Sequence, residues 1–522
     1  MENKPELKRI KIPGPPGTGK THRLVNHYLR KELEEHKTMH KHILYVGFSN
    51  ATVDEARARI NKVFPGNEIL IRTLHSFGKR HLKLPKDGLL KGKAWDDFAL
   101  RYGWKGTTFD GELDDETNLM KYKDYKMQII EYAKAKCMGI DELGSAAHEL
   151  GKQNSIRTIE TLEQLYTDIE SYKKDFKKYE FSDMIKQFVD NKCTPSLVAL
   201  FVDEAQDLNP LEWSMVKHLE TLVHRSYIAG DDDQAIYAFK GGVASTFINL
   251  SGEKDPQIKS NRVPRSVHRE ASKILENIHG RLEKEWLPRE EEGEVIYDKS
   301  LNDINFNEDN WLIMTRTNKM QKPIIEHLER EQIYFEHPKA NILKTAEWRG
   351  FRTWDLLSKG EAVDAADVKY VYKNFFKYDK GKGELEKNFS SGSSLDSYDY
   401  VTLEDLKRDH GLKVDGNWRN LRMTEEQRLQ IEALLEKGID LHSEPKVRVA
   451  TIHKMKGGEC DNVILMTDLT EHIYNQTRRS RSSINTEHRV WYVAVTRAKE
   501  KLYYMRVNPL GQYYYIPGKD II

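Results

Sequence analysis

The sequence predicts an α/β protein with two parallel-sheet domains, each interrupted by an insertion. Three observations predict this fold class. Short apolar runs recur along the chain, and each ends in polar residues, as buried parallel strands do at the edge that carries their chemistry. A glycine-rich segment at 14–19 joins one such run to a helix-forming stretch. The 522 residues also exceed the roughly 250 to 300 that a single core reaches, so several cores are expected.

The first domain is predicted from four apolar runs. The candidate strands are Ile10–Ile12, Ile43–Phe48, Leu197–Val202 and Ser226–Ala229. The stretch Thr21–Glu35 follows the glycine-rich segment and is predicted to be a helix. Between Lys79 and about Tyr179 the text is rich in lysine, glutamate and tyrosine, as in Met120–Lys136, and has no strand-like run. That part is therefore predicted to be a helical insertion.

A second α/β region follows Asn261. Its candidate strands are Trp311–Met314, Val447–Thr451, Asn462–Met466 and Lys501–Val507. A polar insertion from about Gly360 to Glu444 interrupts it, and Pro288–Gly293 and Phe389–Ser394 are predicted to be surface loops. The predicted boundaries are 1–80 with 180–258 for the first domain, 81–179 for its insertion, 259–359 with 445–509 for the second domain, 360–444 for its insertion and 510–522 for a tail.

Composition restricts the class of protein. Lysine plus arginine (83) nearly equal aspartate plus glutamate (82), so affinity for a nucleic acid would come from a local cationic channel. The three cysteines are widely spaced, which argues against a disulfide framework and a cysteine-rich zinc site. No apolar run approaches the ~20 residues that a membrane crossing needs, and the polar start has no signal-peptide core. A soluble cytoplasmic protein without membrane contact is expected.

The glycine-rich segment matches the pattern G-x-x-x-x-G-K-[ST] in full. Its residues are Gly14, Pro15, Pro16, Gly17, Thr18, Gly19, Lys20 and Thr21. Glycines allow successive backbone N–H groups to surround phosphate oxygens. Lys20 is predicted to reach the β- and γ-phosphates, and Thr21 to give its hydroxyl to Mg²⁺. The sequence therefore predicts a nucleotide site.

Two adjacent carboxylates end the third apolar run. Asp203 is predicted to hold the metal, and Glu204 to orient or deprotonate the attacking water. A solvated acidic strand end is the common alternative for an isolated Asp-Glu pair. The apolar run before it and the glycine-rich segment upstream favour the catalytic interpretation.

Hydrolysis also needs cations that face the γ-phosphate, and the planar arginine fork suits this task. Arg497 follows an apolar run that should bury its helix and fix the guanidinium. Arg262 is the second candidate, with Arg265 as its alternative. For any single arginine, a surface or salt-bridging role is the competing interpretation.

The segment 230–240 places an amide that can sense phosphate, Gln234, three residues from aromatic rings that can stack on bases. Three aromatic residues are predicted to stack on the bases of single-stranded DNA: Phe48, Tyr237 and Phe239. Such stacking does not depend on the base sequence. His75 and His453 are predicted backbone contacts. Core packing is the rival interpretation for an aromatic residue, but the polar and glycine neighbours of Tyr237 and Phe239 favour an exposed loop.

The ordered motifs resemble those of the UvrD/Rep type of superfamily 1 DNA helicases, from the glycine-rich segment to Tyr504. The matching segments are Gly14–Thr21 (motif I), Phe48–Asn50 (Ia), Thr73–Ser76, Asp203–Asp207 (II), Gly230–Gly242 (III), Asn261–Arg262 (IV), Thr315–Asn318, Thr451–Glu459 (V) and Glu487–Lys499 (VI). The resemblance implies two RecA-like P-loop NTPase domains that hold ATP and Mg²⁺ in their cleft, and 3′ to 5′ movement along single-stranded DNA.

The resemblance also implies residue roles. It makes Gln234 a γ-phosphate sensor, puts Glu459 near the ribose, places Asn50 among the DNA contacts, and has Arg262 and Arg497 complete the site. There are departures: Met1–Ile12 contains no glutamine, and Asn261 stands where the family has a base-stacking tyrosine. Looser preference for ATP over other nucleotides is therefore expected. Phe239 and Lys240 replace the usual tryptophan and arginine, and the second insertion is short for a subdomain that grips duplex DNA.

The leading prediction is an ATP-dependent 3′ to 5′ DNA helicase or translocase that acts on single strands and on junctions with duplex. A motor subunit of a helicase-nuclease is a second interpretation, although little chain follows the last motif for a fused nuclease. A third is an ATP-driven translocase or remodeller that strips proteins from a strand without unwinding it. The residues leave DNA and RNA open, because stacking does not read the 2′-hydroxyl. A monomer is the default expectation, with a loading, repair or replication protein as a possible partner.

Overall fold

The computed structural model describes residues 7–37, 39–85, 88–104, 109, 111–113, 120–152, 155–297, 299–337, 346–375, 399–410, 418–421, 423–478, 480–507 and 511–514. The chain forms two compact units. The first comprises Met1–Glu294, His453–Glu459 and Thr470–Glu500, and the second comprises Val295–Ile452, Cys460–Leu469 and Lys501–Ile522. Two segments from the last third of the chain thus group with the N-terminal part. None of the described helices combines the length and apolarity that a bilayer crossing requires.

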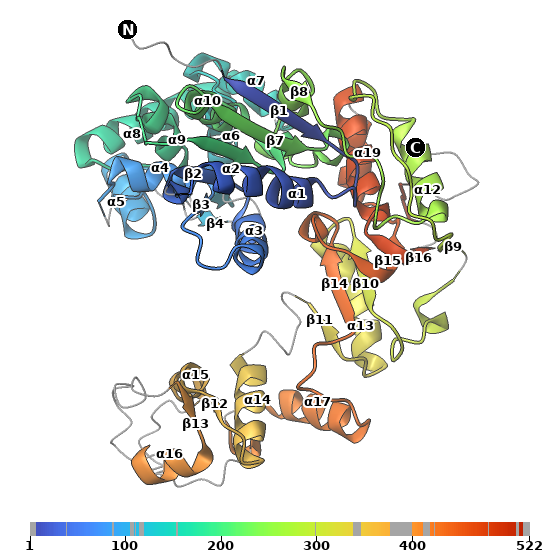
Figure 1. Ribbon diagram of the computed structural model, residues 1–522. Helices are drawn as coiled ribbons and strands as arrows, with labels where there is room; N and C mark the ends of the chain where they lie inside the picture. The colour runs from blue at the N-terminus through green and yellow to red at the C-terminus, as the bar shows by residue number, and fades with distance from the viewer. Residues whose placement is uncertain are drawn as a thin grey trace. The chain divides into compact units, whose positions relative to one another are not determined.

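The first unit contains a six-stranded parallel sheet in the order β3-β2-β6-β7-β1-β8 (Figure 1). Its strands are β1 (Lys8–Pro13), β2 (Ile43–Val46), β3 (Leu70–Arg72), β6 (Ala199–Val202), β7 (Arg225–Gly230) and β8 (Glu253–Lys254). The four predicted strands are confirmed, while β3 and β8 have two or three residues each and were missed. Because all pairs are parallel, the loops after β1, β2, β6 and β7 leave the same edge of the sheet.

Helices cover both faces of this sheet, and Figure 1 shows α10 (Pro210–Glu220) and α1 (Lys20–Arg23) on opposite sides of it. The predicted helix after the glycine-rich segment is confirmed: α1, a π-helical stretch (Leu24–Leu29) and α2 (Arg30–Glu35) run continuously. Its apolar side chains share a buried cluster with α3 (Asn50–Val63) and the strands. The core therefore fixes the residues at either end of these helices. The other helices of this unit, outside the insertion, are α4 (Leu74–Leu82), α9 (Phe181–Asp190), α11 (Ala244–Ile248), α12 (Arg265–Leu275), α18 (Glu471–Thr477) and α19 (Arg481–Val495).

The first insertion is mostly helical but not wholly so. Its helices are α5 (Lys93–Arg101), α6 (Tyr125–Ala135), α7 (Leu143–Glu149) and α8 (Ile156–Phe176). The expectation of no strand was wrong, because β4 (Gly111–Leu113) and β5 (Met120–Tyr122) form an antiparallel pair. The predicted helix over 120–136 begins only at Tyr125, where the Asp124 carboxylate accepts a hydrogen bond from the Lys126 N–H at 2.8 Å and so caps the helix.

The second sheet has the order β11-β14-β10-β15-β16-β9. Its strands are β9 (Glu294–Ile296), β10 (Trp311–Thr315), β11 (Phe335–Glu336), β14 (Val447–Thr451), β15 (Cys460–Met466) and β16 (Ala498–Met505). Strand β10 pairs parallel with both β14 and β15, and the four strands predicted for this region are confirmed. The α/β class with two sheet-containing domains, as predicted, is therefore present, and each sheet has six strands. The loop predicted at 288–293 is confirmed, since it holds no helix or strand.

The second insertion has a core of its own. It contains α14 (Ala346–Ser358), α15 (Ala365–Phe375), α16 (Leu403–His410), α17 (Glu425–Glu436) and the antiparallel pair β12 (Val363–Asp364) with β13 (Tyr400–Val401). The buried Phe351 and Trp354 of α14 belong to the same cluster as Leu406 and Ile431, so that cluster begins before residue 360. The predicted loop 389–394 lies outside the described residues. Helix α13 (Lys322–Arg330) packs on the second sheet through Ile324 and Leu328.

Candidate nucleotide and nucleic-acid site

The glycine-rich loop follows β1 and turns into α1 at Lys20. Gly17 and Gly19 have φ of 75° and 84°, which residues with a Cβ rarely adopt. A Cβ on Gly17 would also lie 2.5 Å from the Ser260 hydroxyl and 2.6 Å from the Arg262 Cβ. The Asn261 N–H donates to the Gly17 carbonyl at 2.8 Å. Glycine at 17 therefore allows the segment 260–262 to approach the loop.

Lys20 is a buried cation without a carboxylate in contact. Its Nζ donates to the Gly14 carbonyl at 2.8 Å and to the Pro15 carbonyl at 3.4 Å, and no ion pair joins it to a described residue. Burial lowers the pKa of Lys20, although Asp231 and Glu204 act in the opposite direction. A buried ammonium that contacts only neutral oxygens is favourably placed to receive an anion such as a phosphate.

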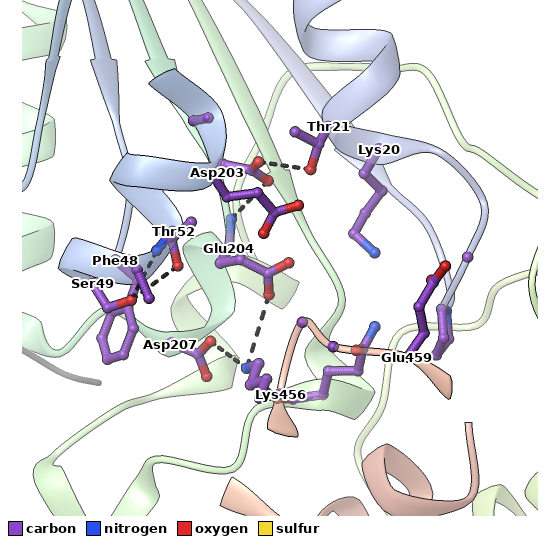
Figure 2. A pocket seen from close by; sticks show the side chains of 18 of the residues that line it. Lys20, Thr21, Phe48, Ser49, Thr52, Asp203, Glu204, Asp207, Lys456 and Glu459 are labelled. Atoms are coloured by element: carbon purple, nitrogen blue, oxygen red, sulfur yellow. Dashed lines mark hydrogen bonds and ion pairs between the residues drawn. The ribbon is translucent and has the colours of Figure 1, made fainter. Parts of the chain in front are cut away.

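Thr21 and Asp203 lie side by side. The Thr21 hydroxyl donates to Asp203 Oδ2 at 2.8 Å (Figure 2). The Tyr45 hydroxyl donates to the same oxygen at 2.9 Å. Burial and the neighbouring Glu204 raise the pKa of Asp203 to about 6, and the two hydroxyl hydrogen bonds oppose the rise. A hydroxyl and a carboxylate oxygen form the hard donor set that suits Mg²⁺. The residues present thus fit that ion.

Glu204 is the second residue after the end of β6 and has a left-handed backbone, with φ of 56°. Its Oε2 accepts a hydrogen bond from Gln206 Nε2 at 2.6 Å and lies 3.9 Å from Lys456 Nζ. Burial acts to raise the pKa of Glu204, but the cations Lys456 and Lys20 and the Gln206 hydrogen bond outweigh it, so the pKa is lowered. An ionised carboxylate near Lys20 of the phosphate loop is suited to accept a proton from water.

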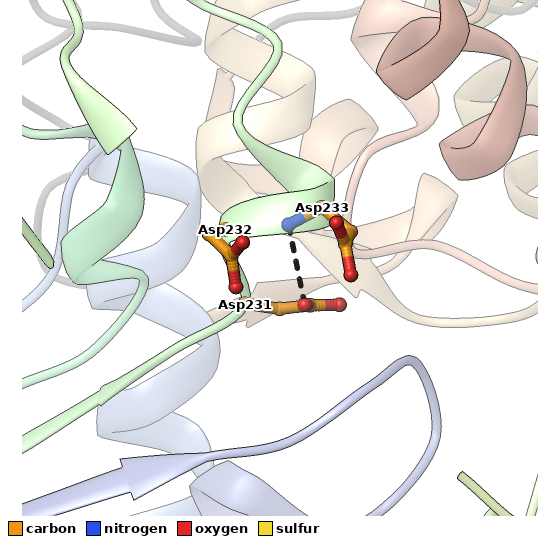
Figure 3. Close-up of side chains that lie close together, drawn as sticks. All are labelled: Asp231, Asp232 and Asp233. Atoms are coloured by element: carbon orange, nitrogen blue, oxygen red, sulfur yellow. Dashed lines mark hydrogen bonds between the residues drawn. The ribbon is translucent and has the colours of Figure 1, made fainter. Parts of the chain in front are cut away.

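The amide of Gln234 is oriented from both ends. Its Nε2 donates to Asp231 Oδ2 at 2.8 Å, and its Oε1 accepts from Arg497 Nη2 at 3.2 Å. Asp231 belongs to a run of three buried aspartates, drawn in Figure 3, and the Lys284 ammonium forms an ion pair with each of them. Arg281 pairs with Asp233 through two hydrogen bonds, at 2.9 and 2.6 Å. These cations account for the acidic cluster, which anchors the loop that carries Gln234.

Arg497 is 1% exposed and is a second buried cation without a carboxylate in contact. Its guanidinium donates to Gln234 Oε1, to the Gly458 carbonyl at 3.1 Å and to the Val493 carbonyl at 2.8 Å, and no described residue forms an ion pair with it. Burial, with a contribution from Arg262, lowers the pKa of Arg497 to about 9. The group is still charged at pH 7, so it too is suited to an anion.

Arg262 is the nearer of the two alternative arginines. Its Nε donates to Glu459 Oε2 at 2.5 Å, and both residues line the cavity. Arg265 is exposed at the start of α12, its backbone N–H donates to the Glu291 carbonyl, and it is not among the residues that line the cavity. The geometry therefore favours Arg262 over Arg265 at the site.

One cavity of about 750 Å³ joins these groups. Figure 2 shows the residues that surround this cavity, among them Lys20, Glu204, Glu459 and Lys456. Phe48, Tyr237 and His453 also line it, so the phosphate residues and the aromatic residues face the same space. All of its lining residues belong to the first compact unit.

The aromatic residues are less exposed than the sequence suggests. Phe239 is 51% exposed, but Tyr237 is 5% exposed, so the expectation of an exposed Tyr237 was wrong. The Tyr237 ring stacks on Phe48 with centroids 5.1 Å apart, and the Lys456 ammonium lies 5.1 Å from the ring centre on the same tyrosine. His453 lies edge-on to Phe239 at 5.6 Å. The four rings therefore form one group, and three of them, those of Phe48, Tyr237 and His453, line the cavity.

Two other predicted DNA contacts are placed differently. Asn50 is exposed at the first position of α3, whose N-terminus Ser49 caps. His75 is 4% exposed, and burial lowers its pKa to about 4, so the ring is neutral at pH 7. Its Nδ1 lies 3.9 Å from a Glu212 carboxylate oxygen in the interior. A direct phosphate contact by His75 would need a rearrangement, and the contact stays a prediction.

The sequence did not single out Lys456, Asp207 or Lys284. Lys456 and Asp207 lie inside recognised motifs, but the ion pair between them joins positions 249 apart in the chain. Lys284 lies in a segment without a pattern. The one sequence signal for a cation such as Lys284 is the run of three aspartates, because three adjacent carboxylates need cations when they are buried.

Two family models match the chain. The UvrD/REP helicase N-terminal domain matches residues 3–255, and the UvrD-like helicase C-terminal domain matches residues 413–508. The chain belongs to the UvrD/REP family of helicases, as its motifs predicted. Its two parallel sheets are consistent with the two RecA-like domains expected of that family.

Similar proteins are distant. The ATP-dependent DNA helicase Rep of Buchnera aphidicola is 21% identical over 626 residues, which cover 95% of this chain and 92% of that protein. A probable DNA helicase II homologue of Mycoplasma capricolum is 20% identical, over 98% of this chain and 84% of that protein. The ATP-dependent DNA helicase PcrA of Leuconostoc citreum is 26% identical over 46% of this chain, but that match spans only 32% of PcrA.

Proposed function

We propose that the protein is an ATP-dependent DNA helicase that moves 3′ to 5′ along single-stranded DNA and separates duplex at junctions. One observation carries the proposal. The buried cations Lys20 and Arg497 face a single cavity without a carboxylate in contact among the described residues, and stacked aromatic rings line the same cavity. A polyphosphate would compensate the cations, and bases would extend the ring stack.

The residues have distinct tasks at a bound nucleotide. Backbone N–H groups of residues 14–19 and the Lys20 ammonium would hold the phosphates, and Thr21 with Asp203 would hold Mg²⁺. The metal ion would neutralise charge that develops on the phosphates. Glu204 would accept a proton from the attacking water, and Arg497 would stabilise charge on the transferred group.

Three further residues have proposed roles at the bound nucleotide: Gln234, Arg262 and Glu459. Gln234 lies between Asp231 and Arg497, so a phosphate that attracts Arg497 would also change the hydrogen bonding of the Gln234 amide. Arg262 would add a second guanidinium, and Glu459, its ion-pair partner, would lie toward the sugar. These roles follow the family pattern at matching positions.

Movement would follow from exchange of these contacts. Segments His453–Glu459 and Thr470–Glu500 reach the cavity through Lys456 and Arg497, whereas the phosphate loop belongs to the N-terminal sheet. A nucleotide held by both sets of residues would draw them together, and hydrolysis would remove the shared contact. Phe48, Tyr237 and Phe239 lie close enough to these segments for their grip on bases to change in the same step.

The test compares strand separation on duplexes with a 3′ single-stranded tail and with a 5′ tail, with and without ATP. Separation of only the 3′-tailed duplex, dependent on ATP, is expected. Separation from a 5′ tail would contradict the polarity. Hydrolysis that is stimulated by single strands but releases no strand would favour a translocase or protein-stripping remodeller instead. Matched DNA and RNA strands in the hydrolysis assay decide between the two nucleic acids.

A further inference from the structure

The first insertion is joined to the sheet domain by a buried group of charged side chains. Lys134 of α6 forms an ion pair with Glu180, the residue before α9, and its Nζ donates to Glu170 of α8 at 2.8 Å. Lys173 of α8 donates to the same Glu180 at 2.9 Å and lies 2.8 Å from Asp183 of α9. The side chains of the two lysines are only 9% and 7% exposed. Two helices of the insertion are therefore tied to the start of α9 by buried charges.

These charges keep one another ionised. Burial acts to raise the pKa of Glu180, but Lys134 and Lys173 outweigh it and lower the pKa to about 2. Burial acts to lower the pKa of Lys134, but Glu180 and Glu170 outweigh it, so the pKa is raised. Separation of these partners would leave uncompensated charges in the interior, so α6 resists displacement from α9.

The end of α6 lies against the loop that carries Phe239. Gly241 of this loop has φ of 85°, and a Cβ placed on it would lie 3.4 Å from the Ala135 Cβ and 3.3 Å from the Lys136 Cγ. Ala135 is buried, is the last residue of α6 and directly follows Lys134. The residue that the ion pairs hold and the residue that meets the loop are thus neighbours in one helical turn.

The loop itself is a closed turn. The N–H groups of Lys240 and Gly242 both donate to the Tyr237 carbonyl, at 2.9 and 3.2 Å, and the Gly241 N–H donates to the Ala238 carbonyl at 3.0 Å. Its exposed ring, Phe239, has contacts with other rings at 5.6 and 6.2 Å between centroids. A turn held by several internal hydrogen bonds shifts as a unit, so a change in its support at α6 would move the exposed ring.

We propose that Lys134 is a positioning residue for DNA binding, because it fixes the end of α6 and this helix end supports the loop that presents Phe239 to a base. The inference rests on the proposed function, in which Phe239 stacks on single-stranded DNA. Lys134 itself is buried and would touch neither the nucleotide nor the base. No residue of α6, which the structure describes in full, lines the nucleotide cavity. Loss of Lys134 should therefore weaken the grip on a strand and spare the chemistry of hydrolysis.

The experiment uses the full chain with Lys134→Met, which removes the charge and keeps a long side chain. Lys173 still pairs with Glu180 in this variant, so one cation remains in the buried group. Lys186→Met removes an exposed lysine that pairs with Asp190 on α9, and it is the matched control. ATP hydrolysis is measured over a range of oligo(dT) concentrations, and binding of a fluorescent ATP analogue reports on the nucleotide site.

Lys134→Met is expected to raise the oligo(dT) concentration for half-maximal stimulation about tenfold, on the order of one base-stacking contact. Turnover without DNA, turnover at saturating DNA and affinity for the analogue should stay within about twofold of the wild type, as should every property of Lys186→Met. A general loss of folding would not produce this split.

Two results with Lys134→Met would overturn the inference. One is an unchanged half-maximal concentration of oligo(dT), and the other is a loss of turnover and analogue binding by the same factor as the loss of DNA affinity. A wild type that neither binds oligo(dT) nor responds to it would overturn the proposed function itself. The two failures are therefore distinguishable.

Lys136 offers a second test that leaves the buried charges intact. Its stem lies against Gly241, while its ammonium lies 3.3 Å from a Glu149 carboxylate oxygen. Lys136→Ala removes the stem, whereas Lys136→Met removes the charge and keeps most of the stem. The half-maximal oligo(dT) concentration should rise in Lys136→Ala and stay near the wild-type value in Lys136→Met. Equal losses in the two variants would mean that the charge contacts DNA directly, and would overturn the supporting role of α6.

Phe239→Ala completes a double-mutant cycle, with oligo(dT) binding measured by fluorescence anisotropy. Because Lys134 acts through this ring, Lys134→Met should weaken binding about tenfold in the wild-type background and by less than about twofold in the Phe239→Ala background. Equal losses in both backgrounds would mean that the buried charges act on DNA binding by another route, and would also overturn the inference.

Discussion

Replacement of Arg497 by alanine is the perturbation that most directly tests the nucleotide site. The guanidinium is buried, carries a charge at pH 7 and contacts only neutral oxygens of Gln234, Gly458 and Val493, with the Thr496 hydroxyl beside it. No described residue supplies an anionic partner to this guanidinium, so a transferred phosphate would be its first. Arginines in this role supply about 10³ to 10⁵ in turnover, so a loss of kcat of at least about a thousandfold is expected.

Nucleotide binding should suffer much less. Lys20 and the loop N–H groups do not depend on Arg497, so the affinity for a fluorescent ATP analogue is expected to fall by no more than about tenfold. Arg497→Lys should recover little, because one ammonium cannot reach the Gln234 amide and the Gly458 carbonyl in the geometry of a planar fork.

The assay is phosphate release under single-turnover and steady-state conditions, with Arg265→Ala as the control. Arg265 is an exposed arginine near the same segment, and its removal should leave turnover unchanged. Normal turnover in Arg497→Ala, or a defect of equal size in Arg265→Ala, would refute the assignment of Arg497 to the transferred phosphate.

Four further outcomes are expected. Glu204→Gln should lose turnover by a hundredfold or more, on the order of a general-base effect, while it retains nucleotide binding; turnover near wild type would contradict its role as base. GTP should be hydrolysed at a rate within about tenfold of ATP, because Asn261 offers no ring for adenine; a much steeper loss with GTP would show a base-reading residue elsewhere. Because the pKa of Asp203 is raised to about 6, protons should compete with Mg²⁺ below that pH. The Mg²⁺ concentration for half-maximal activity should then rise about tenfold per pH unit, and a value constant down to about pH 5 would exclude Asp203 as a ligand. Lys284→Met should lower the free energy of unfolding by about 3 to 5 kcal/mol in denaturant titrations, since three buried carboxylates lose their shared cation; an unchanged midpoint would mean that other groups hold them.

The functional residues at the edge of the first sheet could be predicted because each lies close in sequence to the strand that positions it. Each functional carboxylate or glycine directly follows an apolar run, so Lys20 and Asp203 could be placed at the same edge without coordinates. The arginine at 497 could also be expected at a fixed position, because an apolar helix precedes it and buries it. The positions of these residues could be predicted from periodicity and spacing, whereas their roles depended on the motifs that contain them.

The rest depended on contacts between distant segments. The two strands of the first insertion have three residues each, too few to show an alternating pattern. The exposure of Tyr237 was misjudged because its cover, Phe48 and Lys456, comes from two other loops. Lys456 was not recognised for the same reason: its partners Asp207 and Gln234 lie more than two hundred positions away in the chain.

The buried aspartates before Gln234 restrict what the adjoining loop can do. Lys284 and Arg281 fix the residues up to Asp233, so the loop has a rigid origin. Phe239 lies five residues beyond Gln234, and at about 3.3 to 3.6 Å per residue its tether is no longer than about 18 Å. Under the proposed function, any travel of this aromatic side chain along a strand would therefore be short, and longer progress would require many successive nucleotide cycles.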